Sequence, residues 1–290
     1  MQPYLFPLGA AFGTDNLILH AASRKHRVDN FHGPLSIKTV LRGSVNWRLD
    51  GREIAVDTRS FLVLNHGDAY SMHIDSPVPV ATCCAFFQHG FVERLASDAT
   101  SPLAAALECA ALDRAAPSLA FLSRLHAGGP IPQHVHGLAP RCAGQLQPSG
   151  FEEDFLVLAT ALLNLYKEMT ARIARVPAAR KSTREELFRR VERAREFIHG
   201  QVGTGVSLHA AARAAYLSPF HFHRAFTAAH RQTPHAYVTA LRLSRARTQL
   251  EGGATVADTA HDAGFANAPA FTRLFGAHFG VNPSKVRKIG

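Results

Sequence analysis

Two segments near the C-terminus carry the same pattern, Phe-x-Arg-x-Phe, at residues 222–226 and 271–275. On a helix the two phenylalanines of each pattern fall on one face, and the central arginine, Arg224 or Arg273, falls on another. A guanidinium donates two parallel hydrogen bonds, which suits guanine O6 and N7 or a phosphate. The pattern indicates two helices that bury an apolar face and present a cation to nucleic acid. The alternative role for each arginine is a surface salt bridge.

Each pattern belongs to a longer repeat, in which residues 207–234 align with residues 255–283. Each copy is expected to begin with an N-cap residue, run through a short Ala-rich helix, turn, and cap a second helix. The expected N-caps are Ser207 and Ser218 in the first copy, and Thr255 and Asn267 in the second. This layout is typical of a helix-turn-helix, whose second helix lies in the major groove of DNA. Duplication alone also fits a helical bundle.

A further helix is expected between the two copies, from residue 234 to residue 250, ended by Gly252 and Gly253. At 1.5 Å per residue it spans roughly 24 Å. That length can place two recognition helices about one DNA turn, ~34 Å, apart.

The charge distribution favours a nucleic-acid partner for this region. The whole chain has a net charge of +10. Residues 183–290 hold 15 Lys and Arg against 7 Asp and Glu, whereas residues 1–182 hold 17 against 15. Charge alone fits a basic solvated surface equally well. Together with the repeat, it favours binding to the phosphates of DNA.

The C-terminal third resembles the AraC/XylS family of bacterial transcription regulators. Residues 255–285 resemble the family signature, with an Ala-x-x-x-Gly-Phe turn, the Phe-x-Arg-x-Phe helix and a Phe-Gly-x-x-Pro terminator. Residues 217–226 resemble the first recognition helix and residues 241–247 the linker helix, so the resemblance covers about residues 184–288. The strands near the N-terminus resemble, less specifically, the cupin-like sensing domain of the family.

The resemblance implies a two-domain protein. Its N-terminal domain is an all-β cupin-like barrel with trailing helices, and its C-terminal domain is an all-α tandem helix-turn-helix. It further implies a homodimeric regulator without a cofactor, associated with the bacterial nucleoid. Four cysteines, two of them adjacent, make no disulfide framework and favour a reduced, cytoplasmic setting. No expected strand carries the clustered His-x-His and carboxylate that a cupin enzyme needs for its metal, so no enzymatic activity is expected. The expected partners are double-stranded operator or promoter DNA, a small-molecule effector and RNA polymerase; activation and repression both stay open. Two alternatives are a stand-alone cupin enzyme with an appended binding module and a ligand-independent regulator.

Two departures from the family pattern affect the expected DNA contacts. Tyr216 occupies the first turn where the family usually has glycine, so that turn is either remodelled or strained. The second recognition helix begins Asn-Ala-Pro-Ala at residues 267–270, almost without polar side chains. We therefore expect the first helix to discriminate bases and the second to supply shape and backbone contacts. The expected DNA-contacting residues are Ser218, Phe220, His221, His223, Arg224, Asn267, Thr272 and Arg273.

Residues 35–87 read as short strands that form an all-β barrel or sandwich. Asp50-Gly51 between two alternating runs predicts a hairpin with a type I′ turn. We expect the buried face of this hairpin to carry Val45, Trp47, Leu49, Ile54 and Val56.

Helices are expected after residue 91. One or two short helices are predicted over residues 91–112, the second starting at Ser101-Pro102, and then an irregular connection over residues 127–150. A long helix over residues 151–175 carries an apolar stripe, which indicates either packing within the chain or a dimerisation surface. With Pro177 to Ser182 as linker, the expected division is a sensing domain at 1–150, a helical connector at 151–182 and the DNA-binding domain at 183–290. The members of the stripe are Phe155, Leu158, Leu162, Leu165, Met169 and Ile173.

The N-terminal domain has several residues able to bind a small molecule at the mouth of a barrel. Four of them are also accounted for by plain packing: Trp47, His66, Tyr70 and Met72. Arg24, together with Lys25 and His26, would favour an anionic effector. The pair His134 and His136 has no carboxylate nearby in sequence, so no metal is expected. Cys83 and Cys84 are expected to point to opposite faces of a strand as buried thiols. Neither a signal peptide nor a membrane span is expected.

Overall fold

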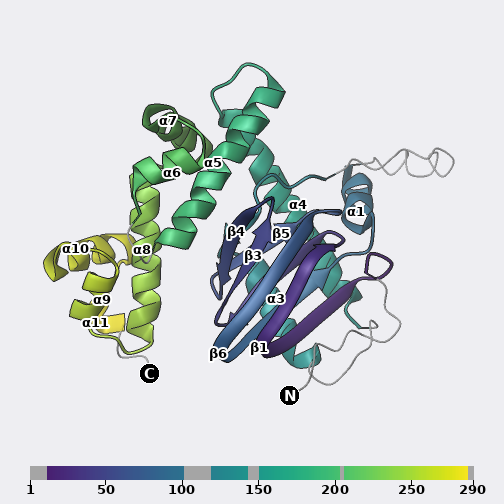
Figure 1. Ribbon diagram of the computed structural model, residues 1–290, viewed down its shortest axis with the longest axis horizontal. Helices are drawn as coiled ribbons and strands as arrows, with labels where there is room; N and C mark the ends of the chain where they lie inside the picture. Colours follow the sequence, from purple (N-terminus) through teal and green to yellow (C-terminus); the bar gives the residue numbers. More distant parts are fainter. Residues whose placement is uncertain (1–11, 101–118, 143–149, 203–205, 287–290) are drawn as a thin grey trace. The chain divides into compact units, whose positions relative to one another are not determined.

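The computed structural model describes residues 12–100, 119–142, 150–202 and 206–286. The chain divides into two compact units, Met1–Ala171 and Arg172–Gly290. The first is built on an antiparallel sheet and the second is all-helical (Figure 1). The expected fold class, a β domain followed by a helical one, is confirmed. No helix in the described ranges combines the length and apolar character needed to cross a bilayer.

The sheet of the N-terminal unit is antiparallel, with the strand order β4-β3-β6-β2-β5-β7 and with β1 paired to β6. Figure 1 shows the two long strands, β1 and β6, side by side. The strands are β1 (Leu17–His32), β2 (Ser36–Arg42), β3 (Ser44–Leu49), β4 (Arg52–Asp57), β5 (Ser60–Leu64), β6 (Ala69–Phe86) and β7 (Leu125–Ala127).

The hairpin between β3 and β4 is confirmed. Leu49 pairs with Arg52 across the turn. Asp50 and Gly51 both have positive φ angles, 51° and 72°, as a two-residue type I′ turn requires. The expected buried face is also confirmed, because all five of its side chains lie in one apolar cluster.

Two strands differ from the sequence-based expectation. β1 was not predicted: most of its residues are charged or polar, and its partner strand among the described residues is β6. β6 is one long strand, whereas short strands are expected throughout residues 35–87. Its pairing with β1 is irregular where Ser76-Pro77 lies, and that irregularity explains the apparent break in the pattern.

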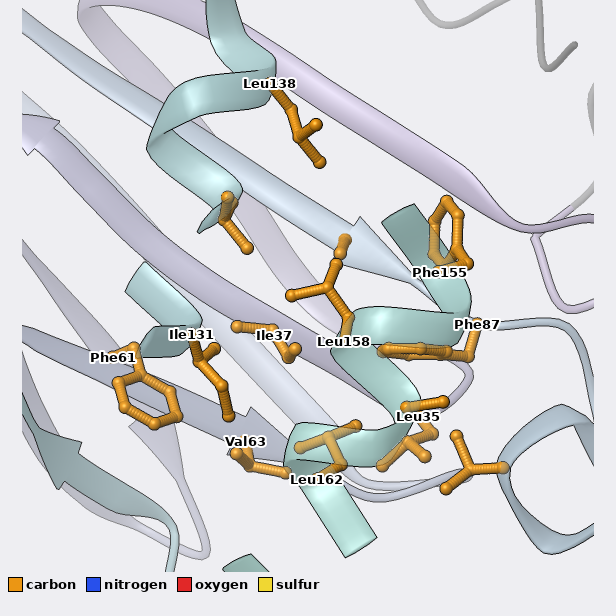
Figure 2. Packing of buried hydrophobic residues seen from close by; sticks show 14 of the residues in the cluster. Leu35, Ile37, Phe61, Val63, Phe87, Ile131, Leu138, Phe155, Leu158 and Leu162 are labelled. Carbon is orange, nitrogen blue, oxygen red and sulfur yellow. The ribbon is translucent and has the colours of Figure 1, made fainter. Parts of the chain in front are cut away.

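One face of the sheet packs against two helices, α3 (Pro130–Cys142) and α4 (Glu152–Arg175). Leu158 and Leu162 of α4 share one apolar cluster with Val63 of β5, Ile131 of α3 and Leu35, which immediately precedes β2 (Figure 2). The opposite face carries a second apolar cluster around Trp47.

The irregular connection expected over residues 127–150 is wrong, because α3 fills most of it. Pro130 and Pro132 lie in its first turn, where a proline costs no intrahelical hydrogen bond. Ile131, Val135 and Leu138 recur at helical spacing and are buried. This spacing predicts a helix, although the Pro and Gly content of the segment is typical of an irregular connection.

The apolar stripe of α4 packs inside the N-terminal unit from Phe155 to Leu165, whereas Ile173 is buried in the helical unit. Phe155, Leu158 and Leu162 belong to its core, and Leu165 is half-buried against it. This stripe is therefore intramolecular packing and not a dimerisation surface. Helix α1 (Phe91–Thr100) precedes α3, whereas the second short helix expected from Ser101 lies outside the described residues.

The helical unit begins at the last turn of α4, and residues 176–180 connect α4 to the helix that starts at Lys181. The expected N-caps are confirmed, since the side chains of Ser207, Ser218, Thr255 and Asn267 each accept a backbone N–H of the helix that follows. The helices are α5 (Lys181–Gln201), α6 (Leu208–Ala214), α7 (Pro219–His230), α8 (Pro234–Glu251), α9 (Val256–Asp262), α10 (Ala268–Phe279) and α11 (Pro283–Val286).

Candidate nucleic-acid interface

The turns that join α6 to α7 and α9 to α10 have the same backbone geometry. In the first, Tyr216 has a φ of 54° and Leu217 N–H donates to the Ala212 carbonyl at 3.0 Å. In the second, Gly264 has a φ of 71° and Phe265 N–H donates to the Ala260 carbonyl at 3.0 Å. The first turn is therefore not remodelled, and Tyr216 adopts a left-handed conformation that costs a non-glycine residue energy.

The two Phe-x-Arg-x-Phe patterns keep their phenylalanines in the core, as expected. Phe222 and Phe226 are buried on α7, with ring centroids 5.5 Å apart. Phe271 and Phe275 are buried on α10 among side chains from α8 and α9. Each second helix is thus fixed by its own aromatic core, and its opposite face is left free to contact a partner.

The free face of α7 is basic and aromatic. His221, His223 and Arg224 are exposed, and the Phe220 side chain is 71% exposed. Ser218 Oγ accepts the His221 backbone N–H at 3.3 Å. Pro219 has no N–H and the Phe222 N–H donates to the Ser218 carbonyl at 2.9 Å, so the Phe220 N–H is the first-turn amide left for an anion such as a phosphate.

The corresponding face of α10 is poorer in polar groups. Asn267 and Arg273 are exposed and Thr272 is half-buried. Asn267 Oδ1 is engaged as the N-cap, accepting the Ala270 N–H at 2.8 Å. The structure thus places all eight expected DNA-contacting residues on α7, on α10 or at their caps.

A buried ionic network that no sequence pattern predicts holds the end of α7. Two guanidinium nitrogens of Arg195 donate to Glu192 Oε2 at 2.9 and 2.6 Å. His230, at the end of α7, has Nε2 3.0 Å from Glu192 Oε1. Burial by itself raises the pKa of Glu192, but Arg195 and His230 together hold it well below its usual range. Burial lowers the pKa of His230, so its ring is neutral near pH 7.

The comparisons with known proteins agree with this geometry. Residues 211–289 match a family model described as a helix-turn-helix domain. The Msm operon regulatory protein of Streptococcus mutans is 26% identical over 126 residues, which are 43% of this chain and 45% of that protein. The matched region thus spans less than half the length of that relative.

Solved structures give further similarities of the same kind. A Chromobacterium violaceum transcriptional regulator with an AraC-type DNA-binding domain is 23% identical, with a TM-score of 0.33, over 35% of this chain and 95% of that one. Fatty-acid-bound ToxT of Vibrio cholerae is 12% identical, with a TM-score of 0.36, over 95% of this chain and 96% of that one. Residues 211–289, within the C-terminal unit, are an AraC-type helix-turn-helix domain.

The AraC-type domain is also tied to the last turn of α4. Arg175 donates hydrogen bonds to the carbonyls of Ala228 and Ala229 at 3.3 and 2.8 Å. These carbonyls lie in the last turn of α7, where no intrahelical donor is available. Arg175 therefore caps the C-terminal end of the first recognition helix.

The structure only partly assembles the expected ligand residues of the N-terminal unit. Trp47, Tyr70 and Met72 lie in one buried cluster. His66 is exposed with its ring 4.1 Å from that of His89, and Arg24 is exposed on β1. Met72 also borders a hollow of about 330 Å³ on the sheet, lined mostly by charged and polar residues.

Two further expectations concern possible metal or redox chemistry. His134 does have a carboxylate nearby, contrary to the sequence-based reading, because α4 brings Asp154 Oδ1 within 3.1 Å of His134 Nε2. Within the described ranges, no cluster of three or more His, Cys, Asp or Glu side chains is placed to hold a metal ion. Cys83 and Cys84 are buried in separate clusters on opposite faces, as expected, and burial raises the pKa of both thiols.

Two buried polar residues on β2, Ser36 and Lys38, are not among the predicted site residues and have no hydrogen-bond partner in the described parts of the chain. They alternate with Ile37 and Thr39, a pattern that is typical of a strand with one solvent-facing side. Both faces of β2 are buried, so the alternation wrongly predicts exposed side chains at Ser36 and Lys38.

Proposed function

We propose that this chain is a DNA-binding transcription regulator whose two helix-turn-helix copies bind successive major grooves of double-stranded DNA. The observation that carries the proposal is the repetition of one geometry: two turns with the same hydrogen bonds, each presenting a helix with an exposed arginine. Helix α8 separates the copies; its 18 residues span about 27 Å. Such a spacing is compatible with grooves about 34 Å apart.

The first copy is proposed to discriminate between bases, and the second to add contacts that do not depend on the base sequence. Helix α7 offers Arg224 for guanine and Phe220 for a thymine methyl group, whereas the start of α10 offers mainly backbone. We expect Arg224→Ala to relax base preference at one or two operator positions and to weaken specific binding by about 1–3 kcal/mol. Arg273→Ala is expected to weaken binding similarly to all sequences.

The test compares these variants on DNA selected from a random duplex library by the wild-type chain. Binding of each variant to the selected sequence and to its single-base substitutions is measured by fluorescence anisotropy. Arg48→Ala, an exposed arginine of the N-terminal unit, is the matched control. Equal loss of base preference in Arg224→Ala and Arg273→Ala would refute the proposed division.

We further propose that the N-terminal unit binds a small effector and that the chain is a homodimer. An effector that favours one arrangement of the domains would change DNA affinity by a population shift. A dimer surface is supported by two adjacent exposed apolar residues of α4, Leu156 and Val157. Sedimentation equilibrium of wild type and of the double variant Leu156→Asp, Val157→Asp tests this; an unchanged mass would reject this surface.

A further inference from the structure

The interior of the N-terminal sheet contains a positive charge that its surroundings do not compensate. Lys38 is 1% exposed, and its Nζ has no hydrogen-bond partner among the described residues. Ser36 is 0% exposed, and its Oγ is likewise without a partner in the described parts of the chain. The two residues are two positions apart on β2 and therefore share a face.

The position of the ammonium group brings it towards Ser36. Lys38 Nζ lies 3.5 Å from the centroid of the Phe86 ring. Phe86 is the cross-strand partner of Ser36 on β6, whereas the partner of Lys38 is Cys84. The lysine side chain thus leans along the strand towards the row of Ser36, and both unpartnered groups face the same space.

Two aromatic rings lie against the ammonium group, Phe86 and Tyr70, and two further rings connect them through ring–ring contacts. Phe86 meets Phe12 at 4.7 Å, Phe12 meets Phe31 at 5.3 Å, and Phe31 meets Tyr70 at 5.6 Å between ring centroids. Tyr70, the last ring of this series, also contacts the lysine, because its ring centroid is 4.9 Å from Lys38 Nζ. Among the four rings Phe12 and Phe31 are half-buried, whereas Phe86 and Tyr70 are buried.

No anionic side chain among the described residues balances Lys38. The ionisable group that acts on it is the Cys84 thiol, and burial raises the pKa of this thiol, which keeps it uncharged near pH 7. Burial lowers the pKa of Lys38 to about 8, which still leaves most of the amine protonated near pH 7. Cation–π contacts are worth only about 2 kcal/mol when desolvated, less than the cost of burying an ammonium group.

The hollow beside Met72 is a weaker candidate for a charged ligand. Its cations are already paired, since Arg27 lies 2.7 Å from Asp29 and Arg48 lies 2.9 Å from Glu53. These pairs are exposed, so they cost little to maintain and call for no further anion.

We propose that Lys38 and Ser36 form the anion-binding end of an effector site inside the sheet, and that the effector is a small carboxylate with an apolar, preferably aromatic, body. The ammonium group and the hydroxyl would each donate to a carboxylate oxygen, and the four rings would cover the body. This inference deepens the proposed function, since it gives the chemical class of the effector.

The test uses the full chain and measures the shift in melting temperature on adding benzoate, phenylacetate, 2-naphthoate or hexanoate. Each acid is paired with its uncharged primary amide at equal ionic strength. We expect at least one carboxylate to raise the melting temperature while its amide does not, because a ligand selective for the folded state stabilises it. Lys38→Met should raise the dissociation constant about 10- to 100-fold, and Ser36→Ala about threefold to tenfold.

The matched control is Lys25→Met, which removes an exposed lysine of β1 and should leave the response unchanged. A second measurement needs no ligand: Lys38→Met should raise the melting temperature of the free chain, because it removes an uncompensated buried charge. The proposal is overturned if no acid acts, if acid and amide act equally, if Lys38→Met keeps the response, or if Lys38→Met lowers the melting temperature of the free chain.

Anisotropy with the selected duplex separates this inference from the proposed function. DNA binding without a carboxylate response would reject the site and keep the regulator. A carboxylate response without DNA binding would keep the site and reject the regulator.

Discussion

At the scale of single residues, Tyr216 shows how the protein departs from its own repeat. It occupies the left-handed position that Gly264 fills in the second copy, and its ring is 74% exposed. The one aromatic interaction it makes among the described residues is with Arg193, whose guanidinium lies 5.0 Å from the ring centroid. An exposed cation–π contact is worth about 0.5–1 kcal/mol, less than the backbone cost of roughly 1–2 kcal/mol. The turn therefore carries net strain.

Tyr216→Gly should change the stability of the AraC-type domain by less than about 1 kcal/mol, because the relieved strain of roughly 1–2 kcal/mol is offset by the lost Arg193 contact and by the greater entropy of glycine in the unfolded chain. Chemical denaturation followed by far-UV circular dichroism measures the change. Tyr216→Ala removes the ring but keeps the strain, so it should be less stable than Tyr216→Gly by about 1 kcal/mol. Equal stability of the two variants would show that the turn is unstrained.

At the scale of elements, the first recognition helix depends on polar groups from its neighbours. Glu192 and Arg195 come from α5 and His230 from the end of α7, and Arg175 caps the same end from α4. A buried ion pair is costly to break, since removing one partner leaves the other charge uncompensated. We expect Glu192→Gln to destabilise the domain by about 3–5 kcal/mol. Thermal unfolding by circular dichroism tests this, with the exposed Glu186→Gln as control; similar melting temperatures for the two variants would argue against a stabilising network.

The same network makes the stability of the domain depend on pH. The folded-state pKa of His230 lies below its ordinary value of about 6.5. As the pH falls, His230 is therefore protonated in the unfolded chain before it is protonated in the folded chain. Stability is therefore complete above about pH 6.5 and falls as the pH drops towards the folded-state pKa. Glu192 acts in the same direction at lower pH.

The contribution of His230 is isolated by comparing wild type with His230→Gln. The free energy of unfolding of wild type should fall more steeply than that of the variant between about pH 6.5 and pH 5. Other histidines whose pKa values are lowered, such as His20 and His136, affect both proteins equally. Parallel pH profiles would mean that His230 does not titrate differently in the folded state.

At the scale of the whole molecule, the two units rest on separate apolar cores. The N-terminal cores lie on the two faces of the sheet, and one core of the AraC-type domain gathers around Phe271 and Phe275. Trp47 is the only tryptophan of the chain and is buried in the N-terminal unit. Its fluorescence therefore reports the unfolding of that unit alone.

Phe275→Ala should destabilise the AraC-type domain by about 3–5 kcal/mol, because it opens a cavity in a fully buried site. The transition seen by far-UV circular dichroism should move to lower denaturant, while the Trp47 fluorescence transition stays in place. A common shift of both transitions would show that the two units unfold as one cooperative body.

The sequence by itself determined the parts of the protein that depend on local rules. The four helix N-caps, the Asp50-Gly51 hairpin and the buried phenylalanines of α7 and α10 all follow from spacing and residue type within a few positions. The repeat also predicted the helix-turn-helix, because the N-caps and the Phe-x-Arg-x-Phe pattern occur at matching positions in both copies.

Only the tertiary structure decided the environment of residues whose partners are distant in sequence. Lys38 has the alternation of a surface strand, yet both faces of β2 are covered by segments far along the chain. Asp154 and His134 are paired although they are 20 positions apart in sequence, and Glu192 and His230 are paired although they are 38 positions apart. Burial and pairing arise from the packing of whole elements, and a local pattern carries no information about which element packs on which face.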